Sequence, residues 1–280
     1  PTAAGATIAW VADGDTGSTT GVGIVFFVIA TLYGASSLST VFIHTTGTSP
    51  PRRHGSVFEE LFAGVRYIAA TPLLRALFLL AFLATLFGMP VQFLMPAFNE
   101  DALGGGPDDL GLLMGAMGVG AVAGSLVLAR MGETGGKGWF MILAALAWAI
   151  ANAWLAAADG VAAALPLAAV GGFFSSSFMS LNNSLIQLSV SNEMRGRVMS
   201  AVMMMWGLMP IGVVPISFLA EALGIARALE ASAVVLVLVV VAAALLLPEL
   251  RRIDRGYADD DGLDAAQGVT PSVAKRGKMD

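Results

Sequence analysis

Seven long apolar stretches run along the chain, and nearly all of its charged residues fall in the gaps between them. Each stretch is 20 to 28 residues long. A helix rises about 1.5 Å per residue, so even the shortest stretch would reach about 30 Å, the thickness of the hydrocarbon core of a bilayer. The pattern predicts membrane-spanning helices at Gly21–Ile43, Leu73–Phe98, Leu110–Met131, Trp139–Ala158, Val161–Leu188, Val198–Ala220 and Ile225–Leu247.

The composition supports the same class. Hydrophobic residues make up 56% of the chain and charged residues 12%, with a mean hydropathy of +0.78, whereas soluble domains carry about 25% charged residues. Buried helices of a soluble protein would need polar helices to cover them, and the sequence offers none. We therefore expect an all-α membrane protein with several spans, for which the lipid bilayer is the first partner.

The basic residues fix an expected orientation. When the gaps are numbered alternately, 14 of the 15 Lys and Arg fall on one side and only Arg227 falls on the other. Cytoplasmic loops retain Lys and Arg, so this side, which includes the C-terminus, is predicted to be cytoplasmic. The basic residues stand at helix ends without forming a stripe, so no nucleic-acid partner is expected.

A linker at 44–72 separates the first span from the remaining six, which fill 73–248. Within this linker, Ser56–Ala70 is predicted to form an amphipathic helix that begins with a capping box, Ser56 and Glu59. Such a helix can lie in the headgroup region or pack on the inner ends of the bundle, and the sequence leaves both open. Its apolar face comprises Val57, Phe58, Leu61, Phe62, Val65 and Ile68.

The two ends of the chain differ from the rest. Pro1–Ala12 is apolar but too short to span a bilayer, so we expect it to be the end of a helix that starts before this sequence, which makes the chain a fragment; this helix end and the first span together occupy 1–43. Residues 249–280 are polar and contain the acidic cluster Asp259–Asp261. This segment is predicted to be a disordered cytoplasmic tail.

Two predicted spans carry polar and aromatic side chains along one helical face. Unsatisfied amides in hydrocarbon cost several kcal/mol, so these faces should point into the bundle or into a wet cavity. They are predicted to form a pocket for an amphipathic solute or, alternatively, interhelical hydrogen bonds, and both readings stay open. The candidate residues of a substrate pathway are Phe82, Thr85, Met89, Gln92, Ser175, Phe178 and Asn182.

Small residues and prolines mark the predicted packing. Gly111 and Gly115, and then Gly120 and Gly124, stand four residues apart and allow close helix approach, either in ordinary packing or at a moving gate. Four prolines interrupt predicted spans and are expected to kink them, because each removes a hydrogen bond from its helix. They are Pro90, Pro166, Pro210 and Pro215.

Catalytic and metal chemistry find no support in the sequence. The segment Gly132–Gly138 is not a phosphate loop, because that motif needs Gly at position 131 and Ser or Thr at position 138. The chain has no cysteine, and its two histidines, His44 and His54, lie in the linker. We therefore expect no enzyme, no metal site and no cofactor.

Several longer segments resemble one family. They are ELFAGVRYIAATPLLR (60–75), NNSLIQLSVSNEMRGRVMS (182–200), GLMPIG (207–212) and LAEALG (219–224). Together they resemble the enterobactin-exporter-like group, or transmembrane secretion effectors, of the major facilitator superfamily. The resemblance extends over about residues 1–250.

This resemblance implies a fold and a function. The seven spans would be helices six to twelve, preceded by a stump of helix five, and 73–248 would be the C-terminal six-helix bundle built from inverted repeats around a cavity. The absent N-terminal half would be a partner. The implied protein is a secondary exporter of small amphipathic molecules, such as siderophores or drugs, that works by alternating access in the bacterial inner membrane. A non-transporting membrane scaffold is the alternative.

Two cytoplasmic loops carry candidate gating residues besides Gly111 and Gly115. The loop at 131–137 resembles a worn copy of the family's D-R-x-G-R motif, with Glu133 in place of the Asp and Lys137 in place of an Arg. In the second loop, Arg195 and Arg197 would point about 200° apart on a helix. We expect one to meet lipid phosphate and the other a carboxylate, either Glu193 or an acidic residue of the absent half.

Overall fold

The computed structural model describes residues 19–42, 57–131 and 136–250, and every regular element in these ranges is an α-helix. Calls on the stump 1–12, on Ser56, on Glu133 and on the tail beyond Leu250 lie outside the described residues. The helices are α2 (Thr19–Val41), α3 (Val57–Ala70), α4 (Pro72–Gly88), α5 (Pro90–Phe93), α6 (Met95–Asp101), α7 (Pro107–Met131), α8 (Lys137–Ala156), α9 (Val161–Leu188), α10 (Asn192–Gly207), α11 (Pro210–Leu223) and α12 (Ile225–Leu246).

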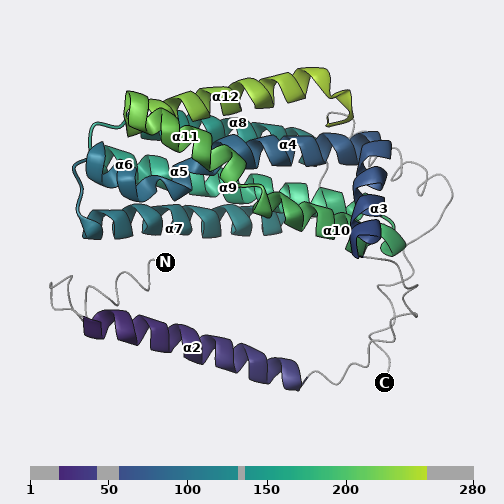
Figure 1. Cartoon of the computed structure of the whole chain (residues 1–280), viewed down its shortest axis with the longest axis horizontal. Helices are drawn as coiled ribbons and strands as arrows, with labels where there is room; N and C mark the ends of the chain where they lie inside the picture. The colour runs from purple at the N-terminus through teal and green to yellow at the C-terminus, as the bar shows by residue number, and fades with distance from the viewer. Residues whose placement is uncertain (1–18, 43–56, 132–135, 251–280) are drawn as a thin grey trace.

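Six apolar traverses in the described chain are long enough to cross a membrane. They run up and down in sequence order: α4 with α5, α7, α8, α9, α10 with α11, and α12 (Figure 1). We call the two ends of this bundle the basic end, where α4, α8 and α10 begin, and the acidic end, where α7, α9 and α12 begin. The all-α membrane fold expected from the hydropathy pattern is confirmed.

The first predicted span corresponds to α2, which stands apart from the bundle. Figure 1 shows α2 running alongside the bundle without joining it, and its side chains from Phe26 to Thr40 are all exposed. This exposure is consistent with an apolar helix whose neighbours lie outside the described residues. That α2 crosses a bilayer stays a prediction.

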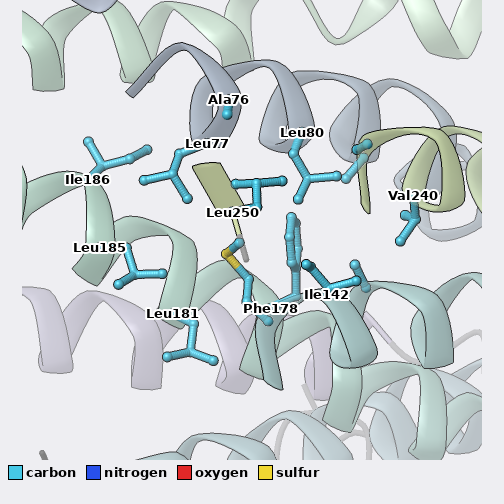
Figure 2. Close-up of a cluster of buried hydrophobic side chains, with 14 of the residues drawn as sticks. Ala76, Leu77, Leu80, Ile142, Phe178, Leu181, Leu185, Ile186, Val240 and Leu250 are labelled. Carbon is cyan, nitrogen blue, oxygen red and sulfur yellow. The ribbon is translucent and has the colours of Figure 1, made fainter. Parts of the chain in front are cut away.

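The core of the bundle has two levels. Towards the basic end, leucines and alanines of α4 pack with α8, α9 and α12 around Phe178, which points into this cluster (Figure 2). Towards the acidic end, Met95 and Phe98 of α6 pack with Leu113 of α7 and Leu229 of α12. The two levels meet where α4 ends, so the break in this helix lies at mid-bundle.

Two runs predicted as single helices are broken, which corrects the sequence-based boundaries. The run Leu73–Phe98 divides at Met89 and Leu94, and the run Val198–Ala220 divides at Leu208 and Met209. Pro90 and Pro210 start the helices that follow, and Pro96 is the second residue of α6, because a proline has no N–H and is accommodated in a first turn. Pro166 and Pro215 instead lie inside continuous helices.

The linker helix α3 lies across the basic end, against the start of α10 and α4 (Figure 1). Leu61, Gly64 and Ile68 face the bundle, whereas Phe62 is 70% exposed and Val65 is 39% exposed. The apolar face predicted for this helix is therefore wider than its contact with the bundle. For the side of α3 that carries Leu61, Gly64 and Ile68, the structure shows the second of the two alternatives, packing against the end of the bundle.

Two exposed tryptophans stand near the two ends of α8. Trp139 in its first turn is 49% exposed, and Trp154 in its last turn is 65% exposed. They are 15 residues apart, which is about 22 Å along the helix. Tryptophan is enriched at both membrane–water interfaces, so we expect one interface near each end of α8.

Candidate functional site

A cavity of about 480 Å³ opens on the side of the bundle where α5 and α6, α7 and α9 meet. Most of its wall is apolar, and two of its lining residues have polar side chains, the Gln92 amide and the Ser175 hydroxyl. Both belong to the predicted substrate pathway, on different spans, and the structure brings them to one cavity. Its lining is Gln92, Phe93, Pro96, Met114, Met117, Gly118, Ala121, Gly172 and Ser175.

The break after α4 turns Gln92 towards this cavity. In one continuous helix Thr85, Met89 and Gln92 would share a face. In the structure Thr85 and Met89 are buried in the bundle, whereas Gln92 is exposed. The Gln92 N–H donates to the Met89 carbonyl, only three residues back, at 2.9 Å. This tighter turn rotates the residues after Pro90 relative to those before it.

The opposite wall is set by a close crossing of α7 and α9. A Cβ atom on Gly120 would overlap the Ala169 carbonyl, and one on Gly172 would overlap the Met117 carbonyl. Gly124 faces the Phe173 carbonyl in the same way. Small residues at these positions let the two backbones touch, so the Gly120–Gly124 step predicted from spacing acts in packing.

Three neighbouring helices cover the carbonyls at the end of α4. Pro90 has no N–H for the Leu86 carbonyl, and a Cβ on Gly212 of α11 would overlap that same carbonyl. Ser232 of α12 donates to the Phe87 carbonyl at 2.7 Å, and Asn152 of α8 donates to the Gly88 carbonyl at 3.3 Å.

Sequence reasoning did not single out Asn152 and Ser232. The sequence does mark both as candidates for a buried polar contact, because each is a polar residue inside an apolar run. Their partners, however, are backbone atoms of a helix 64 and 145 residues away in sequence. No sequence pattern indicates such a pairing.

The other predicted pathway residues lie inside the bundle. Phe178 is fully buried, and its ring centroid lies 6.1 Å from that of Trp148. Asn182 is 3% exposed and donates to the Leu77 carbonyl at 3.4 Å, while its Oδ1 has no hydrogen-bond partner. Phe82 is half-buried. In this arrangement Phe178 packs between helices, and Asn182 forms an interhelical hydrogen bond, which is the alternative that the sequence left open.

No charged side chain lines the cavity. A second cavity, of about 650 Å³, lies at the acidic end between α6, α11 and α12 and is bordered by Asp101, Glu221 and Arg227. In the second turn of α12, Glu230 is exposed on the outside of the bundle. The described residues hold no group of three His, Cys, Asp or Glu that could bind a metal ion.

Comparison with protein families decides the class of this chain. A family model described as transmembrane secretion effector matches residues 17–267. The chain belongs to this family. The resemblance to this group of the major facilitator superfamily, seen in segments 60–75 and 182–200, is thereby confirmed.

A curated relative of this chain is the Multidrug efflux pump Tap of Mycolicibacterium fortuitum, which is 28% identical over 234 residues. The match covers 81% of the chain and 56% of the relative, so the chain spans about half the length of the relative. No solved structure gives a significant match.

The predicted gating residues of this family member are spread over the basic end and α7. Gly115 is buried in α7, whereas a Cβ on Gly111 would meet open space, so Gly111 is not a contact point. Lys137 is half-buried at the start of α8. A role of these residues in gating stays a prediction.

The two arginines at the start of α10 do diverge. Arg195 donates to the Gln187 carbonyl at 3.5 Å, and the Arg197 Nη1 lies 3.7 Å from the Met194 sulfur. Glu193 is exposed in the first turn of α10. Within the described part of the chain neither guanidinium is paired with a carboxylate, so the expected ion pair with Glu193 is not formed here.

Proposed function

We propose that this chain is the C-terminal bundle of a secondary exporter of small amphipathic molecules, such as drugs or siderophores. The cavity bordered by Gln92 and Ser175 would be its contribution to the substrate pathway. In this proposal the cavity opens alternately to the two sides of the inner membrane as the bundle moves against the N-terminal half.

The observation that carries the proposal is the chemistry of the cavity wall. An apolar surface with two neutral polar groups suits a solute that has both apolar and hydrogen-bonding parts. Met114 and Met117 add flexible thioether side chains, which adapt to ligands of different shape. Because this wall carries no charge, it favours the neutral part of such a solute.

The relative supports export over the alternative of a membrane scaffold. Its printed name is that of a multidrug efflux pump, and this chain resembles a little more than half of it. A scaffold would have no need for a polar group turned towards an apolar cavity on its side. Under the scaffold alternative, replacing the cavity residues would leave every measurable activity unchanged.

Export by the complete protein tests the proposal. We expect Gln92→Leu to lower the initial rate of export of a fluorescent amphipathic dye about ten-fold at low dye concentration, because one hydrogen bond to the solute is worth about 1–1.5 kcal/mol. Ser175→Ala should have a smaller effect in the same direction. Efflux from cells that lack their own pumps is the measurement.

Gln187→Leu is the matched control, since Gln187 is exposed near the basic end of α9, away from the cavity. Its export rate should equal that of the parent protein. Unchanged export in Gln92→Leu and Ser175→Ala would contradict the role of the cavity, and no export by the parent protein would favour a scaffold.

We also propose that the basic end is cytoplasmic, as the positive-inside rule indicates. The chain has no cysteine, so single cysteines can be introduced without background. In intact cells an impermeant maleimide should label Asp101→Cys and Asp159→Cys, and Lys137→Cys only after permeabilisation. The reverse pattern would contradict the orientation.

A further inference from the structure

The outward side of α3 combines apolar exposure with positive charge. Phe62 is 70% exposed and Val65 is 39% exposed, and Arg66 and Ala69 are exposed beside them. At 100° per residue these four positions fall within about 100° of the helix surface, so they form one strip. We call these four residues the outward strip.

The inward side of the same helix fixes its level. A Cβ on Gly64 would overlap the Arg197 carbonyl, so the two backbones touch there. Ile68 is 5% exposed in the core cluster. Arg197 is the sixth residue of α10, about 7.5 Å along the axis from its start. The contact therefore holds α3 against the second turn of α10.

A second cation joins the strip at the corner between α3 and α4. The Arg75 Nη1 donates to the Ala69 carbonyl at 3.4 Å, which brings this guanidinium to the C-terminal end of α3. Both Arg66 and Arg75 are exposed, so their remaining N–H groups are free to meet another partner. The acidic residues of α3, Glu59 and Glu60, stand in its first turn, at the other end of the helix.

We propose that the outward strip and Arg75 form a binding surface for anionic phospholipid in the leaflet at the basic end. Phe62 and Val65 would enter the boundary between headgroups and acyl chains, and Arg66 and Arg75 would donate to the lipid phosphate. A helix lying in the interface with an apolar side and basic residues beside it binds membranes in this way. Because the backbones of α3 and α10 touch at Gly64 and the Arg197 carbonyl, lipid bound to α3 also restrains the start of α10.

Lipid is favoured over a protein partner by the position and by the charge. The strip lies at the end of the bundle where α4, α8 and α10 begin, and these spans also carry exposed apolar side chains, at Leu79, Leu143 and Met203. Guanidinium groups match phosphate oxygens with several N–H donors. A polar protein surface would leave Phe62 and Val65 without apolar contact.

Fluorescence of the 280-residue chain in nanodiscs tests this surface without measuring transport, so its result is independent of the proposed function. Val65→Cys carries an environment-sensitive label on the outward strip, and Leu61→Cys carries the same label on the inward side. Nanodiscs of phosphatidylcholine are supplemented with a spin-labelled lipid that quenches near the headgroup, either phosphatidylglycerol or phosphatidylcholine. Iodide reports exposure to water.

We expect the label at residue 65 to be quenched by spin-labelled lipid and protected from iodide, with stronger quenching by phosphatidylglycerol. Arg66→Gln and Arg75→Gln should each lower that preference about five-fold, because one basic side chain near an anionic surface contributes about 1 kcal/mol. Arg66→Lys should retain it. Arg130→Gln is the control, since Arg130 lies in the last turn of α7 and outside α3.

Three results would overturn the proposal. Quenching by iodide would place the strip in water, and protection from both quenchers would mean that protein covers it. The preference for phosphatidylglycerol could also survive in both glutamine variants or fall equally in Arg130→Gln. Either result would show that anionic lipid is attracted by the general positive charge of the basic end and not by a site at Arg66 and Arg75. The label at residue 61 should stay protected in every variant, which verifies that α3 remains on α10.

Discussion

The α7–α9 crossing and the break after α4 border the same cavity but are built in opposite ways. At the crossing two long uninterrupted helices touch along their backbones at Gly120, Gly124 and Gly172. At the break a span is divided at Pro90, and side chains of α8 and α12 donate to its last carbonyls. One wall depends on the absence of side chains, and the other depends on polar side chains.

The difference teaches how each wall responds to change. Close backbone packing has no slack, because a carbonyl that is part of a helix cannot move away from an added methyl group. Hydrogen bonds from Asn152 and Ser232 instead follow small shifts of α4, since side chains reorient more easily than a backbone. We therefore expect the crossing to be the rigid side of the cavity and the break to be the adjustable side.

The largest expected effect is at the crossing. Gly172→Ala should lower the free energy of unfolding by about 2–3 kcal/mol, because the new Cβ overlaps the Met117 carbonyl. Gly111→Ala is the matched control in α7, where a Cβ meets open space, and it should leave stability unchanged or raise it by up to about 1 kcal/mol. Unfolding in detergent by increasing SDS is the measurement, and equal stability of the two variants would contradict the close crossing.

A smaller loss is expected at the break. Asn152→Leu should lower the free energy of unfolding by about 1–2 kcal/mol, because it removes the donor from the Gly88 carbonyl. The Gln92 N–H, four residues further on, donates to Met89 instead and so offers no replacement. The same SDS titration measures this loss. A stability equal to that of the parent protein would mean that the break does not depend on this side chain.

The smallest effect is expected at Asn182, which provides the contrast to Asn152. Its amide donates to the Leu77 carbonyl, but Leu77 lies within α4, where Ala81 stands four residues further along the same helix. Asn182→Leu also removes an Oδ1 atom that has no partner. The two changes offset, so stability should stay within about 0.5 kcal/mol of the parent. A loss as large as that of Asn152→Leu would show that the two amides act alike.

Sequence patterns could predict the spans because the bilayer requires each of them to be apolar and long enough to cross its hydrocarbon core. The ends of Val161–Leu188 agree with α9, and Ile225–Leu247 agrees with α12 to within one residue. The two helix breaks were harder to predict. Pro90 and Pro210 divide their spans whereas Pro166 and Pro215 do not, and at Pro90 neighbouring helices contribute one close contact and two donors to the last carbonyls of α4.

The predicted site shows the same division. Gln92 and Ser175 were identified because a polar side chain in an apolar run must face protein or water. The same reasoning selected Thr85 and Asn182, which are buried. Helical periodicity identifies which residues share a face, but a turn after Met89 changes that face, and no periodicity shows which neighbour covers it.

By itself the sequence determined the class, the number of spans in the bundle and the family, because hydrophobic length, charge and motifs are properties of segments of the chain. Only the tertiary structure decided that Gln92 and Ser175 border one cavity, that Asn152 and Ser232 support the broken span, and that α3 presents Phe62 outward. Each of these depends on contacts between residues far apart in sequence, where a rotation of a few tens of degrees exchanges a buried side chain for an exposed one.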